Sequence, residues 1–85
     1  MEYICYIIYS DQHDKYYVGF TSEAIQVRLQ KHNANHKGFT GKHSDWRLMY
    51  HEIYSTKALA MQREKEIKAW KSRIKLEKLI GLSDK

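Results

Sequence analysis

Apolar and polar positions alternate in blocks over the first twenty residues of the chain. Tyr3–Tyr9 is β-branched and aromatic, is too short for a helix and has no polar face, so it predicts a strand buried on both faces. The polar segment 10–14 predicts a turn, and Lys15–Phe20 predicts a second strand. Two strands joined by so short a polar segment form an antiparallel hairpin.

Helical spacing follows the second strand. Thr21 and Ser22 are good N-caps, and Glu23 stands where the helix dipole favours a carboxylate, so we expect a helix near residues 22–33. One stripe of this helix has the spacing i, i+3, i+4 and i+7 and consists of Ile25, Arg28, Leu29 and His32.

A third strand and two more helices are predicted in the rest of the chain. Residues 33–45 read as a polar, basic loop, and Trp46–Tyr54 has the composition of a strand. Ser55 or Thr56 caps a long helix that ends near residue 71. Ser72 caps a short helix over 73–80, which Gly81 stops.

This order of elements predicts one α+β domain over residues 1–85, with a three-stranded antiparallel sheet flanked by helices. The sequence has no internal repeat, no proline and no segment with the composition of a linker.

Charge and cysteine content narrow the choice of partner and compartment. Fifteen Lys and Arg stand against ten Asp and Glu, for a formal charge of +5, which favours nucleic acid or an acidic membrane face over a neutral partner. A merely basic soluble protein is the alternative. The single cysteine, Cys5, excludes an intrachain disulfide and a thiolate zinc cluster and favours a reducing compartment. No apolar stretch approaches the roughly 20 residues that span a bilayer, so the expected location is the cytoplasm.

Two tyrosines of the hairpin are candidates for chemistry. Strand alternation places Tyr6 with Ile4 and Ile8 on one face, and Tyr17 with Gly19 on one face of the second strand. If the hairpin pairs Tyr6 near Tyr17, the two phenols lie side by side. Gly19 weakens a strand unless something must approach its backbone closely. Taken alone, these residues favour ordinary amphipathic core tyrosines.

Ionisable residues interrupt two helical stripes that packing requires to be apolar. Arg28 and His32 lie on the first helix, and Glu64 lies in a corresponding row on the long helix. Burying such groups costs several kcal/mol unless they are paired or hydrated. One interpretation is a cleft where Arg28 meets a phosphate and Glu64 holds Mg²⁺, an ion that keeps most of its waters. The alternative is that Arg28 and His32 reach water and Glu64 pairs with Lys68.

The order of these residues resembles the GIY-YIG nuclease family, in particular its short standalone bacterial members, relatives of the N-terminal nuclease domain of the excision-repair endonuclease. The resemblance covers about Tyr3–Trp70 and departs from the family in its first triplet and in having no asparagine after Asn35. The motifs that carry it are Ile4-Cys5-Tyr6, Tyr17-Val18-Gly19, Arg28-x-x-x-His32, the Trp46-x-Leu48-x-Tyr50 strand and Ala60-x-x-x-Glu64-x-x-Ile67-Lys68.

The resemblance implies an endonuclease of low sequence specificity that uses one Mg²⁺ or Mn²⁺ ion to hydrolyse phosphodiester bonds in nucleic acid, with DNA favoured over RNA. It implies that Glu64 holds the metal and Arg28 braces the phosphate. Tyr6 and Tyr17 are the motif tyrosines, Tyr6 being slightly favoured as the base, and His32 accepts or orients a proton. A dication and an arginine near a tyrosine would let it ionise below its usual pKa of about 10.

Two functions of other classes stay open. One is a non-catalytic nucleic-acid-binding module, and the other is a protein-interaction adaptor that uses Trp46, Trp70 and the last helix. Whether the protein is the endonuclease or the non-catalytic binding module, we expect its nucleic-acid-binding residues to be Arg28, Lys31, Lys37, Lys42 and His43.

Charge-neutral substitution of Lys37 or Lys42 should weaken nucleic-acid binding, because each removes a cation that pairs with one phosphate. The slope of log affinity against log salt should fall by about one unit per substitution. A salt titration of binding checks this, and unchanged affinity in both variants would count against the loop.

Overall fold

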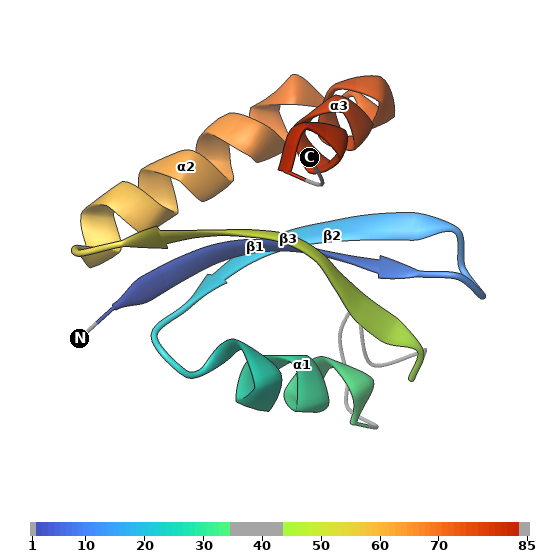
Figure 1. Ribbon diagram of the computed structural model, residues 1–85, viewed down its shortest axis with the longest axis horizontal. Coiled ribbons are helices and arrows are strands. Elements are labelled where there is room, and N and C mark those ends of the chain that lie inside the picture. The colour runs from blue at the N-terminus through green and yellow to red at the C-terminus, as the bar shows by residue number, and fades with distance from the viewer. Residues whose placement is uncertain (1, 35–43, 84–85) are drawn as a thin grey trace.

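The computed structural model describes residues 2–34 and 44–83 and confirms the predicted α+β fold and element order (Figure 1). The strands are β1 (Tyr3–Ser10), β2 (Lys15–Thr21) and β3 (Trp46–Tyr54). The helices are α1 (Ile25–Asn33), α2 (Lys57–Trp70) and α3 (Arg73–Ser83). No helix in these described ranges is long and apolar enough to cross a bilayer.

The three strands form one antiparallel sheet in the order β2-β1-β3, with β1 in the centre. Helix α1 covers one face, and α2 and α3 cover the other (Figure 1). Because β1 has a strand on each side and helices above and below, Ile7 and Ile8 are completely buried. The prediction of a strand buried on both faces is therefore confirmed.

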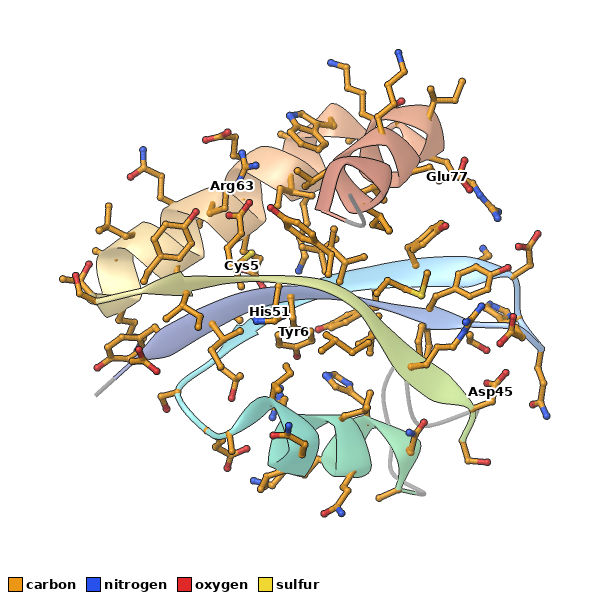
Figure 2. All side chains as sticks on the ribbon, viewed as in Figure 1. Cys5, Tyr6, Asp45, His51, Arg63 and Glu77 are labelled. Atoms are coloured by element: carbon orange, nitrogen blue, oxygen red, sulfur yellow. The ribbon has the colours of Figure 1, made fainter. Side chains whose placement is uncertain are left out.

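Strand alternation divides the buried residues into two cores. The α2-side core is built on Cys5, Ile7, Val18, Ile67 and Ile80. The α1-side core is built on Tyr6, Ile8 and Trp46, with Ile25 and Leu29 of α1 packed against it. Figure 2 shows Tyr6 on the α1 side and Cys5, its neighbour in the strand, toward Arg63 of α2.

A β-bulge in β3 changes which residues of that strand face which helix. Ile7 pairs with Tyr50 and Ile8 pairs with Leu48, so Met49 is the extra residue. Leu48 accordingly packs in the α1-side core, whereas Tyr50 packs in the α2-side core. A bulge has this effect because one inserted residue reverses the alternation of side chains beyond it.

Glu52 ties β3 to α2. Its carboxylate accepts hydrogen bonds from the hydroxyls of Tyr50 and Tyr54 and two from Arg63, at 2.9 Å from Nε and 3.2 Å from Nη2. Burial acts to raise the pKa of Glu52, but these hydrogen bonds together hold it below its usual value. Arg63 also pairs with Glu66, so one guanidinium joins the strand to its own helix.

The cap of α1 differs from the prediction. The helix begins at Ile25 with Ala24 at the N-cap position and no side-chain cap. Thr21 belongs to β2, and its hydroxyl accepts a hydrogen bond from the Glu23 amide at 3.0 Å. The prediction of Thr21 or Ser22 as the cap was wrong because the buried Thr21 hydroxyl serves the turn that leaves the sheet.

The ends of the later helices agree with the prediction except at the last one. Thr56 caps α2 by accepting from the Leu59 amide, and Lys71 ends that helix in a left-handed conformation. Gly81 does not stop α3, which continues to Ser83. Since Ile80 is anchored in the α2-side core, the helix tolerates the roughly 1 kcal/mol that an internal glycine costs.

The Glu52 cluster predicts a loss of stability in alkali. Burial, aided by the hydrogen bond to Glu52 and its charge, raises the pKa of Tyr50 and Tyr54 to about 12. Because the unfolded value is about 10, the stabilisation is complete below pH 10 and disappears as the pH rises toward 12. Urea unfolding at a series of pH values checks this, together with tyrosinate absorbance.

Replacing Glu52 by Gln is the matched variant for this test. It removes the charge that opposes ionisation of the two phenols, so their titration should move toward pH 10. Identical tyrosine titrations in the two proteins would contradict the assignment.

Candidate active site

The hydroxyl of Tyr6 lies over the backbone of Gly19. The two residues are direct partners across β1 and β2, and a Cβ built on Gly19 would stand 2.7 Å from the Tyr6 hydroxyl oxygen and 3.1 Å from Cε2 of Tyr17. Tyr17 pairs with Ile8, so the two phenols are diagonal neighbours on one face. The expectation that Gly19 permits a close approach to the backbone is confirmed.

The polar residues of α1 meet Tyr6 beneath the sheet. The Tyr6 hydroxyl lies 2.6 Å from Nε2 of His32, and Nε of Arg28 donates to the same hydroxyl at 3.3 Å. The ring of Tyr17 is 5.2 Å from that of His32, centroid to centroid. His32 is only 5% exposed, so the alternative that its side chain reaches water is wrong; Arg28 is half-buried. The four residues thus form one contiguous group.

The pKa of Tyr6 is shifted upward. Burial raises it, the hydrogen bond and charge of Arg28 lower it, and the nearby Tyr17 and Glu64 add smaller increases. Without a metal ion, burial therefore outweighs Arg28, and the expectation that a dication together with Arg28 eases the ionisation of this phenol stays a prediction. The same hydrogen bond raises the pKa of Arg28, so its guanidinium stays charged.

Glu64 belongs to α2, which covers the opposite face of the sheet from α1 (Figure 1). Its side chain is 17% exposed and pairs with Lys68 at 3.5 Å, as the simpler interpretation of the sequence predicted. The Lys68 ammonium lies 5.4 Å from the centre of the Tyr17 ring. The negative charge of Glu64 contributes to the raised pKa of both Cys5 and Tyr6, which lie on different faces.

The side chains that could bind a metal here suit Mg²⁺, which keeps most of its water ligands, better than zinc. Within residues 2–34 and 44–83, no three or more His, Cys, Asp or Glu side chains form a metal cluster. Zinc asks for three or four protein ligands, whereas Mg²⁺ is commonly bound by one or two carboxylates. The partly buried Glu64 fits the second requirement.

Only some of the predicted nucleic-acid-binding residues lie in the part of the chain that the structure describes. Lys31 lies on the exposed side of α1 and pairs with Glu23. Lys37, Lys42 and His43 lie outside the described residues.

Sequence reasoning missed Lys57, which shares a cavity of about 450 Å³ with Arg28. No spacing in the sequence relates Lys57 to Arg28, because the two meet only through the packing of α2 against the sheet. The sequence did indicate a role for Lys68, because it follows Glu64 by one helical turn and this spacing predicts an ion pair.

Comparison with known proteins bears on the family and the fold. The family described as the GIY-YIG catalytic domain matches residues 2–78. A UPF0213 protein of Bacillus pumilus (strain SAFR-032) is 41% identical over 56 residues, which are 64% of this chain and 55% of that protein. The chain therefore matches just over half the length of that relative. The solution NMR structure of a UPF0213 protein from Bacillus halodurans superposes with a TM-score of 0.61 at 28% identity, over 96% of this chain and 85% of the other.

The contact between Tyr6 and Gly19 predicts opposite effects of alanine at two glycines. Gly19→Ala should destabilise the protein by about 1–3 kcal/mol, because the buried, hydrogen-bonded Tyr6 hydroxyl cannot move away freely from a new methyl group. Gly81→Ala adds a methyl group where nothing lies within 4 Å, inside a helix, and should stabilise by about 0.5–1 kcal/mol. Urea unfolding measures both, and effects of the same sign would contradict the contact.

Proposed function

Since this chain belongs to the GIY-YIG catalytic-domain family, we propose that it is a divalent-metal-dependent endonuclease that hydrolyses phosphodiester bonds in nucleic acid with low sequence specificity. The observation that carries the proposal is the hydrogen-bonded Tyr6–His32–Arg28 group, to which α2 adds Glu64, a partly buried carboxylate whose charge acts on the pKa of Tyr6. A binding module needs no such carboxylate. We favour DNA over RNA as the substrate on the basis of the family resemblance alone.

Tyr6 is the proposed general base. Arg28 donates a hydrogen bond to its oxygen, and the mechanism requires the Nδ1–H tautomer of His32, in which Nε2 accepts the hydroxyl proton of Tyr6. In the reaction, Tyr6 passes this proton to His32 and takes another from the attacking water. Arg28 stabilises the phenolate that forms between the two transfers.

Arg28 has a second role toward the substrate. Its hydrogen bond to Tyr6 uses Nε, and the other nitrogens of the guanidinium fork suit phosphate oxygens. Charge develops on these oxygens in the transition state, and a fixed cation acts most strongly there. Phosphates are alike at every sequence position, so recognition through Arg28 gives low sequence specificity.

Glu64 is the proposed ligand of Mg²⁺ or Mn²⁺. When bound, such an ion supplies positive charge that polarises the phosphate and offsets the effect of burial on Tyr6. The half-buried position of Glu64 limits competing water, and the ion pair with Lys68 holds the carboxylate in the absence of other cations. The adaptor alternative is weakened, because the Trp46 side chain that it would present to a partner is only 3% exposed.

Glu64→Gln should abolish cleavage while leaving the fold and nucleic-acid binding intact, because an amide binds an oxygen-seeking dication much more weakly than a carboxylate does. Arg28→Ala should lower the rate about a hundredfold or more. The assay uses labelled DNA and RNA of several structures with Mg²⁺, Mn²⁺ or chelator. Glu66→Gln, the more exposed carboxylate of the same helix, is the control and should cut normally.

Tyr6→Phe in the same assay separates chemistry from packing. If Tyr6 is the base, cleavage falls by at least about a hundredfold while Tyr17→Phe costs less. Equal cleavage by Glu64→Gln and wild type would show the metal site to be wrong. A wild type that binds nucleic acid and cuts none of the panel would favour the binding module.

A further inference from the structure

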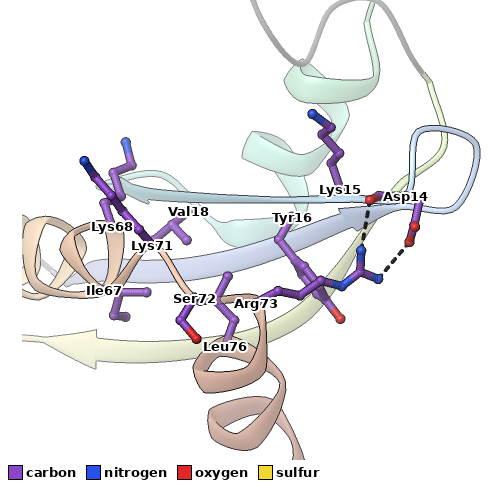
Figure 3. A pocket seen from close by; sticks show the side chains of 10 residues that line it. All are labelled: Asp14, Lys15, Tyr16, Val18, Ile67, Lys68, Lys71, Ser72, Arg73 and Leu76. Atoms are coloured by element: carbon purple, nitrogen blue, oxygen red, sulfur yellow. Dashed lines mark hydrogen bonds and ion pairs between the residues drawn. The ribbon is translucent and has the colours of Figure 1, made fainter.

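A second cationic site lies at the outer edge of β2, where that strand meets the junction of α2 and α3 (Figure 3). It is a pocket of about 330 Å³. Its floor is apolar and is formed by Val18, Ile67 and Leu76. Its polar and aromatic lining consists of Asp14, Lys15, Tyr16, Lys68, Lys71, Ser72 and Arg73.

The charge of this pocket is unbalanced. Arg73 is engaged by Asp14 at 2.7 Å and by Glu77 at 3.3 Å, so it serves as a fixed wall. Lys15 and Lys71 are exposed and have no ion pair within the part of the chain that the structure describes. Figure 3 shows both side chains extending to the same side of β2 as Lys68. The site therefore offers positive charge to an anion.

Lys68 connects the pocket with residues of the candidate active site. Lys68 lines the pocket, pairs with Glu64 and stands over the ring of Tyr17. Tyr16 in the pocket and Tyr17 in the active site are neighbours on β2, and their side chains lie on opposite faces of the sheet. Because β2 is an edge strand of the sheet that residues 2–34 and 44–83 form, no other strand of these ranges stands between the two sites.

We propose that this pocket binds an unpaired nucleotide of the substrate strand, next to the bond that is cut. Lys15, Lys68 and Lys71 contact its phosphates, and the base and sugar lie against the apolar floor. A base within a duplex is stacked and paired and cannot enter, so the preferred substrate carries an unpaired nucleotide beside the cleavage point. This inference rests on the proposed function and adds the class of substrate to it.

The variant Lys15→Thr/Lys71→Gly tests the pocket without threatening the fold. Lys15 is exposed at the start of β2, where threonine suits a strand. Lys71 ends α2 with φ of 48°, a conformation that glycine adopts more easily than lysine. The control, Lys65→Ala/Lys78→Ala, removes the same charge from exposed positions of α2 and α3 outside the pocket.

Binding is measured by fluorescence anisotropy in chelator, with a single-stranded oligonucleotide and a blunt duplex over a range of salt. For the single strand, the pocket variant should bind about tenfold more weakly at low salt. Its log–log salt slope should fall by about 1.4 units, because each of the two removed lysines accounts for about 0.7 through its phosphate. The duplex should be affected less, and the control should stay close to wild type.

Three outcomes would overturn the inference. If the pocket variant and the control bind the single strand equally, the pocket is not a nucleotide site, and the cleavage results for Glu64 stand unaffected. If polyglutamate displaces the oligonucleotide from wild type as well as unlabelled oligonucleotide does, the pocket serves an acidic peptide. If wild type binds no nucleic acid at all, the proposed function itself fails.

Discussion

The side chain of Tyr6 fills the space that a Cβ of Gly19 would occupy, and the arrangement of the α1 face depends on that contact. A side chain at position 19 would push the phenol away from β2 and from His32. With glycine there, the hydroxyl is buried and must find polar partners, which the first helix supplies from Arg28 and His32. One missing methyl group thus sets both the packing and the polarity of the site.

The residues proposed for the active site come from elements on different faces of the sheet. Tyr6, Arg28 and His32 belong to the α1 side, whereas Glu64 comes from α2 on the other side. Lys68 makes the connection, since it pairs with Glu64 and lies over Tyr17. The position of α2 therefore matters, and the double hydrogen bond of Arg63 to Glu52 fixes that helix to β3 one residue before Glu64.

Local pattern predicted the features that local physics determines. Alternation along β1 placed Tyr6 and Cys5 on opposite faces, and Thr56 was a recognisable cap. The spacing of α1 left two positions open for Arg28 and His32, and the structure shows both in contact with Tyr6. The bulge at Met49 could not be predicted, because register depends on the pairing of distant strands. The pKa of Tyr6 depends on how deeply it is buried, which no sequence pattern gives; the catalytic roles stay predictions.

The open edge of β2 has a consequence for how copies of this chain behave toward one another. Strand edges with free backbone groups are templates for pairing with another sheet, and charged side chains beside the edge discourage it. Lys15 and Lys68 supply such charges along β2. A second copy could pair there only by burying these ammonium groups against its own. The cations beside the edge strand therefore act as a barrier to aggregation, and a polyanion that neutralised them would remove that barrier.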